Sequence, residues 1–375
     1  MKPIITSLSI EHFRSLRQLK LEGLGMVNLV TGMNNTGKSS ILEALRILAS
    51  DASPSVLTSI LRYREEDAGE AEEAGRTVEA ESLNQFSSLF TGFPQIPDNK
   101  QAIMLAANGG QRSMQLSISL GFFTEQREQD GTRRLVPQQS VLFPERELMP
   151  ALVMEESGVT KRILPLDYKW RFSRTRIFGP QVGEDPRLPC VFVSPYGGER
   201  TANLGALWDQ IALSDREKEV VQALRIIAPE IEAVSMVGGE GPRRMRSAIV
   251  RSREFARPVP LRSFGDGLNR LFGIVLSLVN AKDGFLLIDE FENGMHHTVE
   301  LDVWQAVFRL SKLLNVQVFA TSHSWDAVET FQKAAALNPD DGLLIRLTRR
   351  GEDIIPTLFQ DKELAVATRE HIEVR

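Results

Sequence analysis

The alternation of hydrophobic and polar residues near the start of the chain predicts strands that lead into a helix. Residues 5–24, ITSLSIEHFRSLRQLKLEGL, indicate two short strands around a polar turn at Arg14–Arg17. Residues 26–32, MVNLVTG, are apolar enough for a short buried strand. Residues 39–50 follow, with three large apolar side chains on one helical face: Ile41, Leu45 and Leu48.

The middle of the chain is less regular and is predicted to add strands and then helices. Residues 51–76 contain the acidic, alanine-rich run REEDAGEAEEAGR, which favours a solvent-facing insertion. From residue 101 to about 193, four segments indicate more antiparallel sheet: QAIMLAA, SMQLSISLGFF, SVLFP and CVFVS. Residues 202–234 indicate a helical subdomain, because apolar residues recur at helical spacing at Leu204, Leu207, Trp208, Ile211, Val220, Leu224 and Ile227.

The last part of the chain alternates between helix and strand, which is the pattern of an α/β fold. Residues 260–328 indicate a loop, a helix, a strand, a loop, a helix, a strand and a polar tip. Two of these strands, FLLIDE and NVQVFATSHS, are apolar and end in polar residues. Residues 342–375 add two strands and a short helix.

A glycine-rich loop follows the first buried strand and has the spacing GxxxxGKS from Gly32 to Ser39. Backbone N–H groups of such a loop cradle phosphates, while the lysine reaches the β- and γ-phosphates and the serine hydroxyl binds Mg²⁺. The alternative is a chance glycine turn, but strand, loop and helix follow one another as a P-loop requires. The expected nucleotide contacts are Gly32, Asn34, Asn35, Thr36, Gly37, Lys38, Ser39 and Ser40.

The two later apolar strands end in side chains that suit phosphate hydrolysis. Asp289 can hold Mg²⁺ through water, and Glu290 can face a water beside the γ-phosphate. The imidazole of His323 can sense the same phosphate. Each strand end has an ordinary structural explanation when taken singly. Together with the P-loop they predict Lys38, Glu290 and His323 as catalytic residues and Ser39 and Asp289 as metal ligands.

A second glycine turn, SFGDG, precedes the apolar helix LNRLFGIVLSLV. Its serine, its backbone amides and the helix N-terminus can face a phosphate, and the alternative is an N-cap before an ordinary helix. Because one P-loop already serves one nucleotide, a surplus anion site favours ATP held between two copies of the chain. The expected contacts from the second copy are Ser263, Gly265 and Gly267.

Composition narrows the class of protein. The 375 residues, 42% of them hydrophobic, suffice for one large or two modest domains. A net charge of −5 argues against a protein that coats nucleic acid, but it is compatible with a local basic patch on the surface. The single Cys190 excludes a disulfide framework and a cysteine zinc site and fits a reducing cytoplasm. No long apolar run predicts a membrane span, so we expect a cytoplasmic protein without a membrane partner.

The order of these motifs resembles the ABC-type ATPase heads related to SMC and RecF proteins, and most closely the ATPase part of the OLD family and its small bacterial relatives. The resemblance rests on IEHFRSL, TGMNNTGKSSILEAL, WDQIALSDREKEVVQAL, SFGDG, LLIDEFENGMHH, FATSHS and HIEVR. It implies an α/β P-loop NTPase with a mixed sheet core, an N-terminal antiparallel β-subdomain and a helical signature subdomain. It also implies that Glu290 polarises water, that His323 is the switch histidine, and that SFGDG acts in trans.

Several features depart from that family or stay open. SFGDG is a looser version of an LSGGQ-like signature, so its phosphate contact is less secure. The glutamine that usually completes the Mg²⁺ shell has no clear equivalent, and Gln85 and Gln95 are candidates. Residues 292–297 match the loop that crosses the dimer interface, whereas His296 and His297 also suit simple exposure to solvent.

The resemblance predicts one ATPase domain over residues 1–375, with a poorly matched insertion and β-rich region at 51–200 and a helical and signature region at 201–270. The sequence has no sustained heptad pattern, so we expect no long coiled-coil arm. OLD proteins carry a Toprim nuclease after the ATPase, and the about 50 residues after His323 are fewer than the ~100 of a typical domain. We therefore expect no nuclease domain here.

The expected function is a Mg²⁺-dependent ATPase that forms a homodimer or higher homo-oligomer around ATP. By family analogy it would switch a separate effector, a nuclease or toxin, in bacterial anti-phage defence. A second interpretation is that ATP mainly holds the oligomer together and slow hydrolysis acts as a timer. A third is a RecF- or SMC-like DNA-binding ATPase in repair or maintenance, supported by the arginines of residues 241–258: Arg243, Arg244, Arg246, Arg251, Arg253 and Arg257. A solvated strand pair explains that segment equally well.

Overall fold

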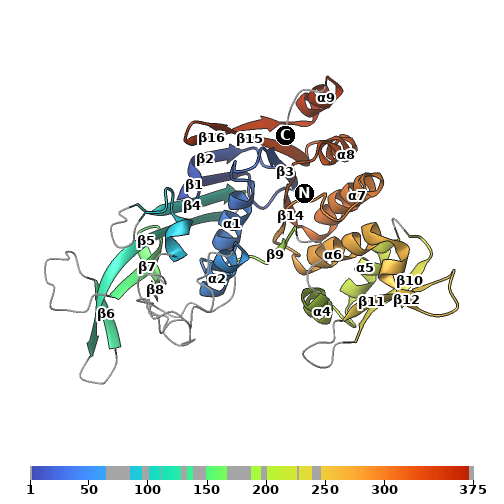
Figure 1. Cartoon of the computed structure of the whole chain (residues 1–375), viewed down its shortest axis with the longest axis horizontal. Helices are drawn as coiled ribbons and strands as arrows, with labels where there is room; N and C mark the ends of the chain where they lie inside the picture. Colours follow the sequence, from blue (N-terminus) through green and yellow to red (C-terminus); the bar gives the residue numbers. More distant parts are fainter. Residues whose placement is uncertain are drawn as a thin grey trace, which may run out of the picture.

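The fold is built from two large sheets and one small sheet, with helices between and beside them. The computed structural model describes residues 2–64, 85–94, 101–110, 112–127, 133–137, 149–166, 187–195, 201–225, 228–238 and 246–370. Figure 1 shows the strands of the antiparallel sheet on one side and helices α6, α7 and α8 on the other. The central six-stranded sheet lies between them.

The central sheet has the strand order β16-β15-β3-β14-β13-β9 and is parallel except for its edge strand β16. Every residue of the inner strands β3, β14 and β13 is buried, which explains their apolar runs, since both faces of a parallel sheet are covered. The strands are β3 (Val27–Gly32), β9 (Cys190–Val193), β13 (Phe285–Ile288), β14 (Gln317–Thr321), β15 (Gly342–Arg350) and β16 (Asp353–Phe359).

The segment CVFVS departs from expectation. It forms β9, which pairs in parallel with β13 and so belongs to the central sheet, and its assignment to an antiparallel sheet was wrong. A parallel strand finds its partner through a long connection, here about 90 residues later, so local pattern does not reveal the pairing. SVLFP lies outside the described residues.

The second large sheet is antiparallel, with the order β2-β1-β4-β5-β7-β8 and with β6 paired to β5. The predicted β-subdomain thus exists, but strands after residue 100 complete it. The turn between its first two strands is shorter than expected, because Leu16 already begins the second strand. The strands are β1 (Ser7–Phe13), β2 (Leu16–Glu22), β4 (Ile103–Gly109), β5 (Arg112–Arg127), β6 (Arg133–Pro137), β7 (Met149–Glu156) and β8 (Val159–Pro165).

Helix α1 (Lys38–Ala49) lies between the two large sheets and contacts strands of both. Helix α2 (Pro54–Tyr63) packs beside it, with Ser53 as its N-cap and Leu57, Ile60 and Leu61 buried. The prediction that a solvent-facing insertion begins at residue 51 was therefore wrong for this part, because the amphipathic spacing of α2 buries one face. A short 3-10 helix, η1 (Gln85–Leu89), follows.

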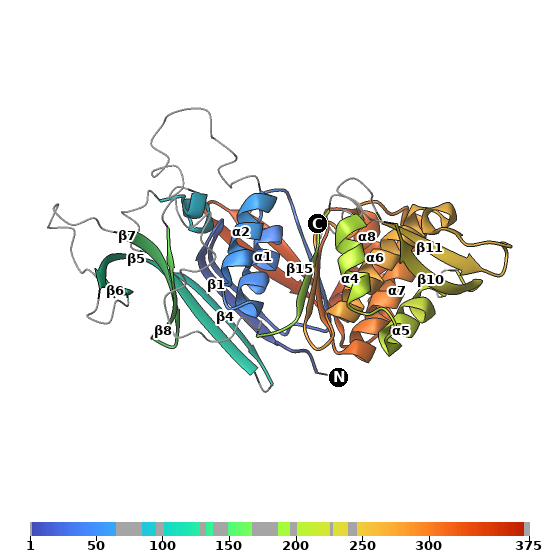
Figure 2. The same cartoon turned by 90° about the horizontal axis from the view of Figure 1, so that it is seen from below.

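The other face of the central sheet is covered by three helices, and Figure 2 shows the successive layers from the side. They are α6 (Asp266–Asn280), α7 (His297–Leu314) and α8 (Trp325–Ala336). Beyond α6 lie the helices α4 (Thr201–Asp209), α5 (Asp215–Leu224) and η3 (Leu261–Phe264). The small sheet lies beside them and consists of β10 (Ile231–Val237), β11 (Ser247–Ser252) and β12 (Val259–Pro260). Helix α9 (Asp361–Arg369) packs against α8. The helical interpretation of residues 202–234 holds for α4 and α5, but its end is strand β10.

Among the described residues, no helix combines the length and apolar character that crossing a membrane requires.

Candidate nucleotide site

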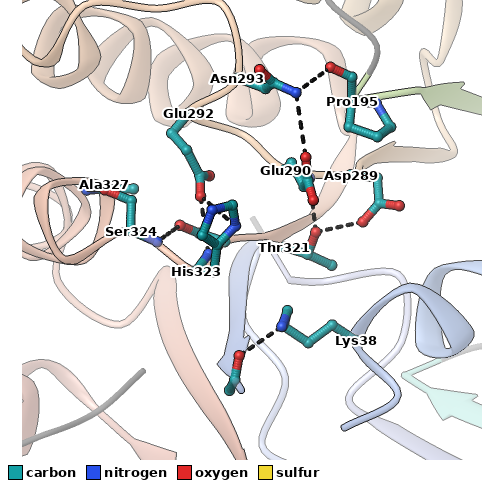
Figure 3. Close-up of polar contacts among 12 residues, drawn as sticks. Lys38, Pro195, Asp289, Glu290, Glu292, Asn293, Thr321, His323, Ser324 and Ala327 are labelled. Atoms are coloured by element: carbon teal, nitrogen blue, oxygen red, sulfur yellow. Dashed lines mark hydrogen bonds and ion pairs between the residues drawn. The ribbon is translucent and has the colours of Figure 1, made fainter. Parts of the chain in front are cut away.

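Three of the motifs predicted from sequence, namely the P-loop, the carboxylate pair and His323, meet at one edge of the central sheet. Strands β3, β14 and β13 are parallel neighbours, so their carboxyl ends lie side by side. The P-loop follows β3, Asp289 and Glu290 follow β13, and His323 follows β14. Figure 3 shows Lys38, the two carboxylates and His323 around this edge.

The P-loop is closed by its own lysine. Lys38 Nζ donates to the carbonyl oxygens of Gly32, at 2.6 Å, and Met33, at 3.0 Å. The Thr36 hydroxyl donates to the same Met33 carbonyl at 2.8 Å. Partial burial lowers the pKa of Lys38, whereas the nearby carboxylates of Asp289, Glu290 and Glu292 oppose that shift. A cation held over loop carbonyls beside a helix N-terminus suits a phosphate chain.

Two glycines give the loop its shape. Gly32 has φ 143°, and a Cβ there would lie 2.5 Å from the Leu347 carbonyl oxygen. Gly37 caps α1 with φ 83°, where a Cβ would lie 2.7 Å from Leu16 Cδ2. The other predicted contacts are the exposed Asn34 and Asn35, the buried Thr36, and Ser40 on the buried side of α1.

Asp289 and Ser39 face each other across the site. The Ser39 hydroxyl donates to Asp289 Oδ1 at 3.1 Å. A hydroxyl and a carboxylate oxygen are ligands that Mg²⁺ prefers, and Mg²⁺ commonly takes few protein ligands and completes its shell with phosphates and water. The donor set therefore fits a nucleotide-bound Mg²⁺, and the described residues hold no group of three or more His, Cys, Asp or Glu arranged for a metal ion.

Thr321, at the end of β14, is a site residue that our sequence interpretation missed. Its hydroxyl donates to Asp289 Oδ1 at 2.6 Å and accepts the backbone N–H of Glu290 at 2.9 Å. The side chain is fully buried. A hydroxyl at the buried end of an apolar strand is a usable signal, because it must find hydrogen-bond partners there.

Glu290 adopts the left-handed conformation, with φ 49°, at the start of the turn after β13. Asn293 donates from Nδ2 to Glu290 Oε2 at 3.3 Å and to the Pro195 carbonyl at 2.5 Å. Figure 3 shows both contacts. The predicted base is thus oriented by a residue of its own turn.

His323 is oriented by Glu292. Glu292 Oε1 lies 3.0 Å from the backbone nitrogen of His323 and 3.2 Å from its Nδ1. The His323 side chain is 57% exposed, so it stands at the open side of the site. His296 and His297 are exposed at the start of α7, where His296 is the N-cap.

The SFGDG segment spans the end of η3 and the start of α6. Ser263 and Gly265 are exposed, and neither shares a hydrogen bond or ion pair with the P-loop in the described part of the chain. Gly265 caps α6 with φ 100°. At Gly267 a Cβ would lie 2.9 Å from Val299 Cγ2, so this glycine also allows α6 to approach α7. Gln95 and the side chain of Gln85 lie outside the described residues.

A buried cluster of ion pairs centres on Glu43 of α1, the helix that follows the P-loop. Glu43, on α1, forms an ion pair with Arg14, whose Nε lies 2.5 Å from Glu43 Oε2, and accepts a hydrogen bond from Arg64 Nε at 2.7 Å. Burial raises the pKa of Glu43, whereas the two arginines oppose that shift. Arg14 comes from the turn after β1 and Arg64 from the end of α2. The cluster therefore ties the P-loop helix to both neighbouring elements.

Two protein families match parts of the chain. The family described as "AAA domain, putative AbiEii toxin, Type IV TA system" matches residues 151–328. The family described as "AAA ATPase domain" matches residues 1–101. The second match contains the P-loop, and the first contains Asp289, Glu290 and His323.

The individual relatives are either similar over nearly the whole chain at low identity or similar over a short segment only. An "ATP/GTP phosphatase" of Helicobacter pylori is 23% identical over 379 residues, which cover 94% of this chain and 97% of that protein. The "DNA replication and repair protein RecF" of Acinetobacter baylyi is 47% identical over 49 residues, 13% of this chain and 14% of RecF. A solved SMC head, bound to the C-winged helix domain of ScpA, has a TM-score of 0.49 at 12% identity, covering 96% of this chain and 99% of that one.

Proposed function

We propose that this chain is a P-loop ATPase with the architecture of an ABC-type head and that it hydrolyses Mg²⁺-bound ATP with Lys38, Ser39, Asp289 and Glu290; the matches of two of its regions to AAA ATPase families support this. The observation that carries the proposal is the contact between Ser39 and Asp289, since it joins the P-loop to the strand that ends in the predicted base. Bound Mg²⁺ would neutralise charge that develops on the phosphates.

Each of these residues has a separate task. Lys38 turns from the loop carbonyls to the phosphate oxygens, since an ammonium group prefers charged partners to neutral ones. Ser39 and Asp289 hold the metal. Glu290 takes a proton from the attacking water, and His323 contacts the γ-phosphate from the open side.

The test is steady-state phosphate release with matched surface controls. Lys38→Ala should lose nucleotide binding, and Glu290→Gln should keep it while turnover falls by roughly 10²-fold or more. Lys333→Ala and Glu329→Gln are the controls, because those residues form an exposed ion pair on α8 that contributes little to stability. Wild-type turnover in Glu290→Gln would overturn the assignment of the base.

A second element of the proposal is that the active unit is a homodimer, or a higher homo-oligomer, in which SFGDG of one copy faces the nucleotide of the other. The exposure of Ser263 and the left-handed Gly265 support this, because the loop is accessible and its helix N-terminus favours anions. Mixing Lys38→Ala protein with Ser263→Arg protein should restore part of the activity, since a mixed dimer contains one intact pair of half-sites. Equal inactivity of the folded, dimeric mixture would count against a shared site.

The third element is that the dimer switches a separate effector, a nuclease or toxin, in bacterial defence. The match to a family described with the AbiEii toxin supports this direction. We locate the protein in the cytoplasm, where a chain with one cysteine needs no oxidising compartment. The effector should dock on residues 51–200 or on the helices between residues 204 and 231, with an affinity that depends on nucleotide.

The effector is tested by co-purification from the native host with nucleotide-free protein and with ATP-trapped Glu290→Gln protein. A partner held in one state and released in the other is the expected result. The purified chain should not cut DNA. Metal-dependent cleavage that survives mutation of the ATP site, or a partner indifferent to nucleotide, would argue against the switch.

A DNA-binding ATPase of the RecF or SMC kind is the second candidate. Arg251, Arg253 and Arg257 are exposed on and beside β11, and the local similarity to RecF points the same way. Two of the arginines already have acidic partners: Arg253 Nε lies 3.4 Å from Glu232, and Arg246 lies 2.6 Å from Asp209. Arg243 and Arg244 lie outside the described residues. Duplex DNA that binds with a steep salt dependence, weakened by Arg251→Ala, would favour this candidate.

A further inference from the structure

The turn that follows Glu290 contains a side chain that holds the Glu290 carboxylate. The Asn293 backbone N–H donates to the Glu290 carbonyl at 3.0 Å, which closes the turn. The Asn293 amide then donates to Glu290 Oε2 at 3.3 Å and to the Pro195 carbonyl at 2.5 Å. An amide nitrogen carries two hydrogens, so both contacts form at once and fix the direction of the carboxamide.

The second contact reaches a different part of the fold. Pro195 follows β9 and stands at the beginning of the connection to α4, which leads into the helical and signature region. The end of β9 is itself held near the site, because the Asp289 backbone N–H donates to the Val193 carbonyl at 2.9 Å. The Asn293 side chain thus links the Glu290 carboxylate to Pro195, the residue at which the connection from β9 to α4 begins.

We infer that Asn293 is a positioning residue, which holds the Glu290 carboxylate in its working orientation and ties that orientation to the end of β9. This inference rests on the proposed function, in which Glu290 is the base. A carboxylate that takes a proton from water must be placed to within a fraction of an ångström, and a displacement of about 1 Å can cost roughly 10²-fold in rate.

The first experiment measures kcat and KM for Asn293→Ala. We expect kcat to fall by about 10-fold and KM for ATP to change by less than about twofold, since the residue touches the base and not the nucleotide. Asn108→Ala is the matched control, because this asparagine makes a side-chain contact to Ser113 on the antiparallel sheet. An Asn293→Ala protein with unchanged melting temperature and unchanged kcat would overturn the inference.

The second experiment asks whether Asn293 acts through Glu290. In the Glu290→Gln background, adding Asn293→Ala should cause no further loss of turnover, whereas independent roles would multiply the two losses. A full additional loss in the double variant would overturn the inference while leaving the proposed function intact. Wild-type turnover of Glu290→Gln alone would instead mark failure of the proposed base, so the two failures are distinguishable.

Discussion

Glu292 Oε1 accepts a hydrogen bond from the His323 backbone N–H at 3.0 Å and lies 3.2 Å from the ring Nδ1 of the same residue. The Glu292 side chain is 13% exposed, whereas the ring of His323 is 57% exposed. A largely buried carboxylate therefore orients a solvent-facing imidazole. The turn at residues 291–294 thus contains the groups that hold both His323 and Glu290.

The contact predicts that Glu292 and His323 act as one unit. Glu292→Ala should lower kcat by about 10-fold because the ring loses its orientation, and His323→Ala should lower kcat at least as much because the ring itself is lost. The double variant should be no slower than the worse single variant. Glu329→Ala, on the surface of α8, controls for loss of a carboxylate. Losses that multiply in the double variant would show that the two residues act separately.

Thr321 should be needed for both stability and metal use. Thr321→Val keeps the shape but removes the donor to Asp289 and the acceptor for the Glu290 N–H. We expect a loss of about 1–3 kcal/mol in the free energy of unfolding, because buried polar groups lose their partner. Half-maximal turnover should need more Mg²⁺. Thr321→Ser, which keeps the hydroxyl, should stay near wild type, and equal defects in both variants would point to packing instead.

Gly32 should not tolerate a side chain. In Gly32→Ala the new Cβ would meet the Leu347 carbonyl oxygen and would sit on a backbone with φ 143°. The loop must then shift, and we expect at least a ~10-fold loss of ATP affinity, which corresponds to about 1.4 kcal/mol. Gly351→Ala is the control, since φ is 64° there with no atom within 4 Å of the Cβ. Equal ATP affinity of Gly32→Ala and wild type in a titration would contradict this account.

Glu300 should make stability depend on pH. Burial raises its pKa, nearby Glu292 and Asp326 add to the shift, and the hydrogen bond from Thr330 and His297 oppose it. A raised pKa in the folded state means that the stabilising contribution is complete below the unfolded value, near 4.5, and is lost as pH rises through the folded value. Ionised Glu300 therefore weakens the fold at neutral pH.

Glu300→Gln tests this sign. The amide oxygen keeps the acceptor for Thr330, at 3.3 Å in the wild-type protein, without a titrating charge. Relative to wild type, the variant should gain stability on the order of 1 kcal/mol at pH 8 and much less at pH 4.5. Urea unfolding at the two pH values measures the difference. A gain of equal size at both would mean that the charge of Glu300 is not its cause.

The sequence by itself determined the P-loop and the strand that carries Asp289 and Glu290. Gly32, Gly37 and Lys38 stand at spacings that follow from local backbone geometry, so a short segment contains all the information. The buried strands were predictable for a similar reason, because a parallel strand covered on both faces needs an unbroken apolar run. The parallel central sheet confirms the predicted α/β fold, and the matches of two regions to AAA ATPase domains agree with the predicted ATPase.

Only the tertiary structure decided which distant residues complete the site. Thr321 reaches Asp289 and Asn293 reaches Pro195 through contacts that span 32 and 98 residues, and no local pattern encodes such pairings. The same reason explains β9, which joins the central sheet beside β13, and α2, whose buried face has a partner only once α1 is folded. Local spacing specifies the groups that can bind phosphate and metal. Their mutual orientation depends on strand order and on hydrogen bonds, because those bonds form only when strands that are separated in sequence lie side by side.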